Sequence, residues 1–380
     1  MRLAFGIGWI AMAVSAAQAQ WDIETSNTTA DLRGIHSVGG GVAWASGTNG
    51  TVLRTEDGGF EWQTCAIPPG AEKLDFRGIQ AFDANTAIVM SSGKGDLSRL
   101  YKTTDGCHSW KLVFTNPDKD GFWDAIEFSN RPQDRSSGPF IVPGALIGDP
   151  VNGVFPIFVM RNSGETWTRW DAEKSVHTPR AHPDEALFAA SNEALICPGS
   201  NGPFAFVTGG SEARIYLAEE HSPFDVGFWM ALSSNSLKFP KGQSAGAFAI
   251  AARHRPQSPF YDFMVVGGDY AKPDAPGASA FVVVGNRPFA ETRKIQLAIQ
   301  PPHGYRSAVA YDAATKTWIT VGPNGTDIST DDGRNWRAVH PDPALHEPPD
   351  ADRNWNALSL PFVVGPHGRI GKLNPQALKP

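Results

Sequence analysis

The sequence predicts an all-β fold, a seven-bladed β-propeller closed by an N-terminal strand in the last blade. Three observations predict it: a turn motif present in four copies, seven short apolar strand starts, and terminal segments that complement each other. The 39 Gly and 30 Pro, with 12 Trp and 22 Phe, suit many short strands joined by tight turns. We therefore expect a single domain over residues 20–380.

The turn motif consists of Ser or Thr, then Asp, Gly and finally Trp. Its copies are residues 55–62, 103–110, 161–167 and 329–336, and the third has lost the acid. The carboxylate can accept backbone N–H bonds, the Gly supplies a positive φ, and the Trp packs between blades. The residues with this expected structural role are Asp57, Trp62, Asp105, Trp110, Trp167, Asp331 and Trp336.

The seven strand starts divide the chain into blades. Intervals of roughly 44–50 residues suit a four-stranded blade, and the longer middle units indicate extended loops. The last unit has room for only three strands. Residues 20–25 resemble the strand after each turn motif, so they can supply the missing outer strand and leave no open edge. The starts lie near Leu32, Phe76, Phe122, Glu185, Ala245, Tyr305 and Asn354.

The N-terminus predicts export. Arg2 precedes an apolar stretch from Leu3 to Ala16, and Ala17-Gln18-Ala19 matches an A-x-A cleavage site. Residues 1–19 are therefore expected to be a signal peptide cleaved near Ala19, which leaves a periplasmic or secreted chain. A membrane anchor is the alternative, but the stretch is short for a span.

Cysteine usage leaves two possibilities open. Cys65 and Cys107 fall in neighbouring repeats and can pair in an oxidising compartment, which leaves Cys197 free. The alternative is three unpaired thiols. No Cys/His spacing indicates zinc, and neither a metal nor a cofactor is predicted. Residues 116–127 nearly fit a calcium loop, but Asn116 replaces its first acid and Pro117 follows immediately, so calcium binding stays open.

Charge excludes one class of partner. A net charge of −6 and a pI near 5.9 argue against nucleic-acid binding, which needs a basic face. We expect a monomer that binds a protein partner or an extracellular glycan.

Propeller geometry predicts where a ligand binds. The start of each innermost strand and the loop after each second strand open on the same face, around a central funnel. Charged groups that meet there can shift one another's pKa values and hold a ligand. Asp124, Asp149, Glu185 and Asp269 are the candidate catalytic acids. The full expected ligand-binding or partner-binding set is Arg33, Arg77, Asp124, Asp149, Glu185, Asp269, Tyr270 and Arg306.

The chain resembles the photosystem II stability/assembly-factor-like family, whose propellers carry the Asp-box (BNR) turn of the sialidase-like superfamily. The resemblance implies a seven-bladed binding or assembly scaffold whose arginines contact a partner protein, here Arg33, Arg77 and Arg306. Cys107 departs from the Asp-box glycine. The segments that carry the resemblance are residues 75–77, 122–126, 148–150, 208–210, 266–270, 304–307 and 321–336.

Sialidases and Asp-box glycanases are the rival comparison. They imply a carbohydrate-active enzyme, a glycoside hydrolase or lyase that uses funnel carboxylates and arginines. The chain lacks the sialidase F-R-I-P segment and reads Phe76-Arg77-Gly78-Ile79 instead. The sequence therefore leaves open whether the protein is an enzyme.

Overall fold

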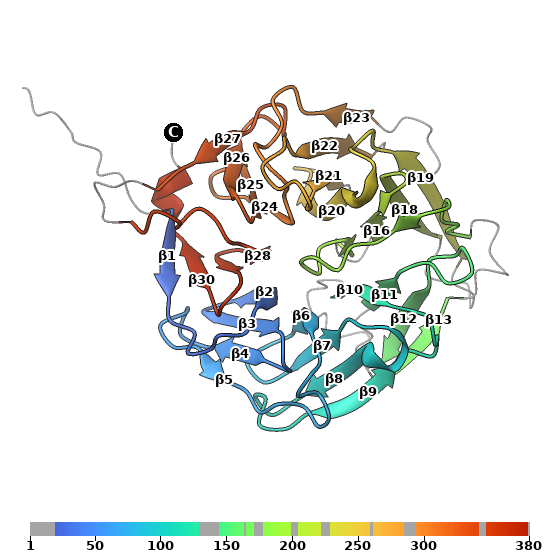
Figure 1. Ribbon diagram of the computed structural model, residues 1–380, viewed down its shortest axis with the longest axis vertical. Helices are drawn as coiled ribbons and strands as arrows, with labels where there is room; N and C mark the ends of the chain where they lie inside the picture. Colours follow the sequence, from blue (N-terminus) through green and yellow to red (C-terminus); the bar gives the residue numbers. More distant parts are fainter. Residues whose placement is uncertain are drawn as a thin grey trace, which may run out of the picture.

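Seven antiparallel sheets stand around a common axis in the computed structural model, as Figure 1 shows. The predicted seven-bladed β-propeller is confirmed. The structure describes residues 20–128, 144–162, 165–170, 178–198, 204–221, 229–258, 261–284, 294–341 and 347–378. The predicted signal peptide, residues 1–19, lies outside the described residues.

Each blade has four strands, ordered from the axis outwards. The first three blades are β2 (Leu32–Gly39), β3 (Val42–Gly47), β4 (Val52–Thr55) and β5 (Gln63–Thr64); β6 (Phe76–Ala81), β7 (Ala87–Ser91), β8 (Arg99–Thr103) and β9 (Lys111–Thr115); and β10 (Trp123–Phe128), β11 (Gly144–Gly148), β12 (Ile157–Asn162) and β13 (Thr166–Arg169). A short 3-10 helix, η1 (Gly95–Leu97), precedes β8.

The remaining blades keep the same order. They are β15 (Leu195–Ile196), β16 (Phe204–Val207), β18 (Arg214–His221) and β19 (Trp229–Ser236); β20 (Gly242–His254), β21 (Tyr261–Asp269), β22 (Ala278–Val283) and β23 (Lys294–Leu297); β24 (Ala308–Asp312), β25 (Thr317–Gly322), β26 (Gly325–Ser329) and β27 (Arg337–Val339); and the closing blade, β28 (Ala357–Ser359), β29 (Phe362–Val364), β30 (Ile370–Leu373) and β1 (Trp21–Glu24). The 3-10 helix η4 (Pro375–Leu378) follows β30.

Face-to-face stacking of the blades explains the composition of the second strands. The second strand of a blade packs against a neighbouring blade on each of its two faces. Its sequence is therefore a continuous apolar run and does not alternate between apolar and polar residues. Every residue of β7, which reads AIVMS, and of β25, which reads TWITVG, is buried.

The N-terminal strand closes the ring, as predicted. β1 pairs antiparallel with β30, with Trp21 opposite Leu373 and Glu24 opposite Ile370. The buried indole of Trp21 packs 6.0 Å from that of Trp355 and donates its Nε1–H to Oγ1 of Thr326 at 3.1 Å. The first and last strands therefore share one blade, with β1 as its outermost strand.

Three copies of the turn motif fold alike. In each, the Asp carboxylate accepts the hydroxyl of the Ser or Thr two residues earlier at 2.9 Å and a backbone N–H four residues later at 3.0–3.1 Å. The Asp residues therefore hold the turn. The following Trp side chains are buried, and they are Trp62, Trp110 and Trp336, together with Trp167 in the third copy.

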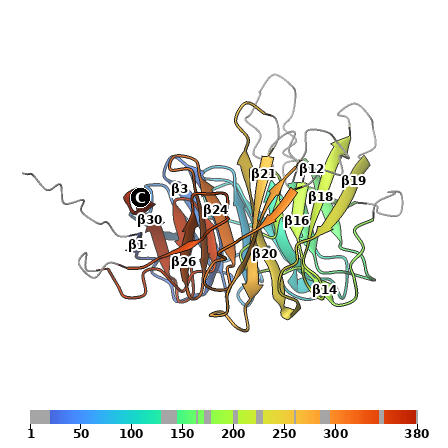
Figure 2. The same cartoon turned by 90° about the horizontal axis from the view of Figure 1, so that it is seen from above.

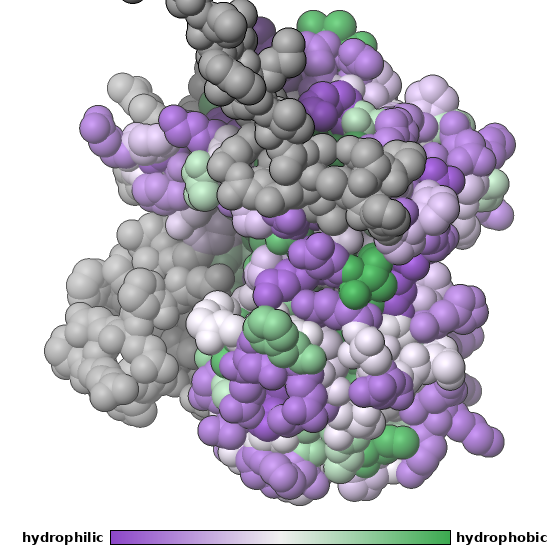
Figure 3. All heavy atoms as spheres, turned by 90° about the vertical axis from the view of Figure 1, so that its left-hand side faces the viewer, coloured by the Kyte–Doolittle hydropathy of each residue, from purple (hydrophilic) through white to green (hydrophobic). Residues whose placement is uncertain are grey.

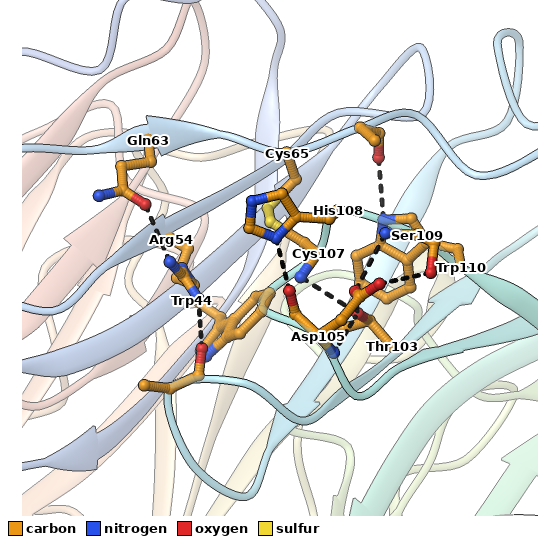
Figure 4. The surroundings of a disulfide bond; sticks show 12 residues. Trp44, Arg54, Gln63, Cys65, Thr103, Asp105, Cys107, His108, Ser109 and Trp110 are labelled. Atoms are coloured by element: carbon orange, nitrogen blue, oxygen red, sulfur yellow. Dashed lines mark hydrogen bonds between the residues drawn. A yellow bond between two sulfur atoms is a disulfide. The ribbon is translucent and has the colours of Figure 1, made fainter.

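A disulfide joins the first two blades. Cys65 follows β5 and Cys107 lies in the turn of the next blade, with Cα atoms 5.3 Å apart (Figure 4). Cys107 takes a φ of 65° at the position that Gly59 and Gly333 occupy in the other turns. Trp110 donates its Nε1–H to the carbonyl of Ala66 at 2.9 Å beside the disulfide. Cys197 is a free, partly buried thiol.

The fourth blade departs from the predicted strand start. Glu185 begins β14 (Glu185–Ala186), which pairs with β17 (Gly209–Gly210), but the innermost strand β15 starts only at Leu195. Residues 187–194 separate the two pieces, which belong to different sheets. β17 also pairs with β20, which gives the sheet of the fifth blade six strands.

The ring is uneven in height. Strands β18 to β21 continue past the body of the ring on the side away from β14, as Figure 2 shows. On the side of the closing blade, the described surface in Figure 3 is mostly hydrophilic, with scattered apolar residues. The described residues include no helix long and apolar enough to cross a bilayer.

Candidate functional site

The predicted site residues lie on one face of the ring. The loop after each second strand bonds to the residues just before the innermost strand of its own blade: Ser92 N–H donates to the carbonyl of Asp75 at 3.0 Å, and Tyr270 N–H to that of Ser244 at 3.0 Å. We call this the start face. The Asp-bearing turns lie on the opposite face, the turn face, since Gly58 N–H bonds to Gly41 in the hairpin between β2 and β3.

Residues 187–194, which we call the plug, bond to the innermost strands of other blades. Asn192 pairs with Ile126 of β10 as a strand would, accepting its N–H and donating to its carbonyl, both at 2.9 Å. A Cβ at Gly78 of β6 would lie 2.4 Å from Oδ1 of Asn192, so only glycine admits this close approach.

The next plug residue, Glu193, bonds to the innermost strands of two further blades. The Glu193 carboxylate accepts the N–H of Val309 in β24 at 2.8 Å and the N–H of Leu358 in β28 at 3.3 Å. Ser191 donates its hydroxyl to the carbonyl of Ser307 at 2.6 Å. Burial raises the pKa of Glu193 well above its usual value. The plug thus ties the innermost strands of the third, sixth and closing blades together.

Asp124 and Asp149 hold the plug from the third blade. Asp149 accepts the N–H of Leu187 at 3.0 Å, and burial raises its pKa to about 6. Asp124 is 1% exposed, and burial followed by the neighbouring Asp149 charge raises its pKa well above the usual value. Arg77 and the N–H groups of Asp149 and Ala189 oppose this rise.

Arg33 and Arg77 share one carboxylate. The Nε atoms of Arg33 and Arg77 lie 3.3 and 2.8 Å from the two oxygens of Asp75, and Arg77 also donates to the plug carbonyl of Ala189 at 3.1 Å. Both arginine side chains stay partly exposed, at 29% and 28%. Arg33 has a further, longer contact with Asp31 at 4.0 Å. This pair leaves guanidinium surface open on the start face.

The plug also carries part of an aromatic shelf. Phe188 of the plug stacks on Phe248 of β20 at 4.1 Å, and Tyr270 lies 6.1 Å from both rings. Tyr270 is exposed, whereas Phe248 is buried. Phe188 directly precedes Ala189, whose carbonyl accepts the bond from Arg77, so the plug connects the shelf to the arginine pair.

The carboxylates of Glu185 and Asp269 both have hydrogen-bond partners within the protein. Glu185 is buried, and it accepts the hydroxyl of Thr208 at 2.6 Å and Nε–H of Arg214 at 2.9 Å. Asp269 accepts the hydroxyl of Ser244 at 2.6 Å, and this bond is the main cause that lowers its pKa. Both carboxylates fix local backbone beside the shelf.

Arg306 does not join the other arginines at the surface. It is 1% exposed, and it forms an ion pair with the buried Asp327 of β26 and donates to the carbonyl of Tyr305 at 2.9 Å. Its second side-chain acceptor is Asn324. The partner contact that the resemblance implied for Arg306 is therefore not available at its buried side chain.

Side-chain bonds between innermost strands were missed by sequence reasoning. His36 of β2 accepts the N–H of Ala81 in β6 at 2.9 Å, and Gln80 of β6 donates to Glu127 of β10 at 2.5 Å. Burial lowers the pKa of His36 to about 4 and raises the pKa of Glu127 to about 8. Each residue occupies an ordinary strand position, so only the neighbouring blade reveals its role.

The calcium-like segment uses its acids in ion pairs. Asp118 pairs with Arg169, and Asp120 lies 2.8 Å from Nζ of Lys94. Within the described ranges, no group of three or more His, Cys, Asp or Glu side chains is placed to hold a metal ion.

A groove of about 680 Å³ lies where the ring closes. It runs between residues 23–28 after β1 and residues 366–369 before β30. Arg369, a cation in its lining, forms an ion pair with Asp350 at 3.1 Å. The Cζ atom of Arg369 also lies 4.7 Å from the ring centre of Trp355. The groove therefore offers little unpaired charge to a ligand.

Comparison with known proteins shows the fold. No family model and no curated protein matches the chain. It is similar to the structure of YCF48 bound to D1 peptide, at 18% identity and a TM-score of 0.56, covering 94% of this chain and 97% of that one. YCF48 from Cyanidioschyzon merolae gives 18% and 0.56, with 94% and 100% covered. The WD40 propeller domain of Doa1 gives 11% and 0.55, with 94% and 98% covered.

Proposed function

We propose that this protein is an exported, non-enzymatic scaffold that binds a segment of a protein partner on its start face. One observation carries the proposal: the plug connects the partly exposed Arg33–Arg77 pair, through Ala189, to the Phe188–Tyr270 shelf. Guanidinium groups bind carboxylates and backbone carbonyls, and an exposed aromatic ring packs on apolar side chains. We therefore expect a segment with an acidic residue close to an apolar one.

The comparisons support a binding role. A YCF48 protein has been solved bound to a D1 peptide, and that propeller shares its fold with this chain. We propose further that the three alike turns are Asp boxes of the BNR kind, because their Asp-centred hydrogen bonds match what that motif requires.

The environment of Asp124 and Asp149 does not favour the alternative of a carbohydrate-active enzyme. Asp124 is buried, and both Asp124 and Asp149 accept N–H groups of the plug, so both carboxyl groups have a structural role.

Export fits the disulfide between Cys65 and Cys107, since such bonds persist in oxidising compartments. Mass spectrometry of the mature chain should find Gln20 at its N-terminus. A mature chain that still contains residues 1–19 would contradict export by a cleaved signal peptide.

Selection from a phage-displayed library of random dodecapeptides tests the binding role. Peptides enriched on the immobilised chain should bind roughly tenfold more weakly, about 1.4 kcal/mol, to Arg33→Glu or Tyr270→Ala. The matched control is Arg334→Glu on the turn face, which should leave the affinity unchanged. Peptides that bind all variants alike, or no enrichment at all, would refute the proposed site.

A further inference from the structure

Two histidines lie together on the start face, between the sixth blade and the closing blade. The rings of His303, which precedes β24, and His340, which follows β27, have centres 6.1 Å apart and planes at 85°. Their side chains are 44% and 69% exposed. Neither histidine belongs to the proposed peptide site.

Each ring lies close to a buried carboxylate. Nδ1 of His303 lies 2.6 Å from Oδ1 of Asp327, and Nδ1 of His340 lies 3.5 Å from Oδ2 of Asp352. Both carboxylates are essentially inaccessible, at 0% and 2% exposure. Because Nδ1 of each ring lies close to a carboxylate, Nε2 is the nitrogen left for a metal ion.

The histidines are not needed to neutralise these carboxylates. Asp327 already pairs with Arg306, and Asp352 lies 3.1 Å from Nε of Arg353. In the described part of the chain, Nε2 of neither ring has a hydrogen-bond partner.

We infer that His303 and His340 form a two-histidine site for a borderline divalent transition-metal ion such as Ni²⁺, Cu²⁺ or Zn²⁺. A buried carboxylate behind each ligating imidazole is the usual outer shell of such sites. Two imidazoles on one tetrahedral ion have ring centres roughly 5 Å apart, given a metal–nitrogen distance of about 2.0 Å. A small rotation of the more exposed His340 side chain would shorten the observed separation of 6.1 Å to this value.

The site is open, with two protein ligands. Since no third His, Cys, Asp or Glu is placed to complete a cage among the described residues, water or a group from a ligand fills the remaining positions. Imidazole and water suit the borderline ions, and affinity should follow Ni²⁺ < Cu²⁺ > Zn²⁺.

Other histidines of the chain provide the matched comparison. His182 lies 3.3 Å from Glu212, and His367 lies 3.9 Å from Asp31. Each has a carboxylate neighbour, as His303 and His340 have, but no second imidazole is in contact with either in the described residues. A histidine–carboxylate pair alone therefore does not make the site, and His367→Gln is the control.

Calorimetric titration of Ni²⁺ into the full chain, free of any affinity tag, tests the inference. One ion per chain should bind, and His303→Gln or His340→Gln should weaken binding tenfold or more. His367→Gln should change it less than twofold. No saturable binding by the unaltered chain, or equal binding by the double variant, would overturn the inference. Thermal unfolding of each variant checks that it is folded.

The coordination itself can be read with Cu²⁺. Electron paramagnetic resonance of the chain with one equivalent of Cu²⁺ should show hyperfine splitting from two imidazole nitrogens, reduced to one in either single variant. A signal from one nitrogen in the unaltered chain would overturn the shared site. The inference does not rest on the proposed peptide binding, because Arg33 and Tyr270 take no part in it.

Discussion

Arg77 and Arg306 occupy matching places, each just before or at the start of an innermost strand. Their burial and their bonding partners nevertheless differ. Arg306 is buried against Asp327 on the third strand of its own blade. Arg77 faces the axis, shares Asp75 with Arg33, and holds a carbonyl of the plug. The difference shows that position in the repeat places a side chain on a face, whereas the residue opposite decides whether it remains exposed.

The largest expected effect is at Arg306. Arg306→Met leaves Asp327 buried without its closest cation, which should lower the free energy of unfolding by about 3–5 kcal/mol. Urea unfolding measures this. Arg334→Met on the exposed turn face is the control and should stay within about 0.5 kcal/mol. If the two variants were equally stable, the buried ion pair would not be the structural link that we describe.

The second-largest effect on stability is expected at the plug. Glu193→Ala leaves the N–H groups of Val309 and Leu358 without acceptors, which should cost about 2–4 kcal/mol of unfolding free energy. Glu193→Gln keeps an acceptor oxygen and, because burial favours the neutral acid, should cost clearly less. Equal losses in the two variants would show that the negative charge, and not the hydrogen bonds, holds the plug.

Stability should also fall as the pH rises through the titration of Glu127. Its pKa is about 8 in the folded chain and near 4.5 when exposed, so between these values the folded chain binds more protons than the unfolded chain. The contribution, on the order of 2 kcal/mol, is present below pH 4.5 and lost by pH 8. Glu127→Gln should flatten this slope, as unfolding at a series of pH values would reveal. An unchanged slope would contradict the burial of the carboxyl.

Arg77 should matter less to stability than Arg306. Arg77→Met loses one charge-assisted bond to Ala189 and a partly exposed ion pair, so about 1–2 kcal/mol is expected. The same urea measurement applies. A loss as large as that of Arg306→Met would erase the contrast between the two arginines.

The ring could be predicted from sequence because its signals are local. The turn motif at 55–62 and its copies fix the outer hairpins, and the resemblance of residues 20–25 to the last strand of each blade fixes the closure. Each signal lies within about ten residues, so spacing alone reveals it.

The plug could not be predicted because nothing in residues 187–194 repeats. Asn192 and Glu193 bond to strands more than sixty residues away in the chain. The sequence did show unusually long middle units, but it placed the extra length in surface loops. The same limit applies to Arg306, whose burial depends on Asp327 and not on any feature of its own segment.

One comparison tests the central claim most directly: the affinity of the selected dodecapeptides for Arg33→Glu and for Arg306→Lys, each shown to be folded. The account predicts a loss of tenfold or more with Arg33→Glu and little change with Arg306→Lys, whose positive charge stays inside the sixth blade. A loss confined to Arg306→Lys would contradict it and place recognition at the junction between the sixth blade and the closing blade.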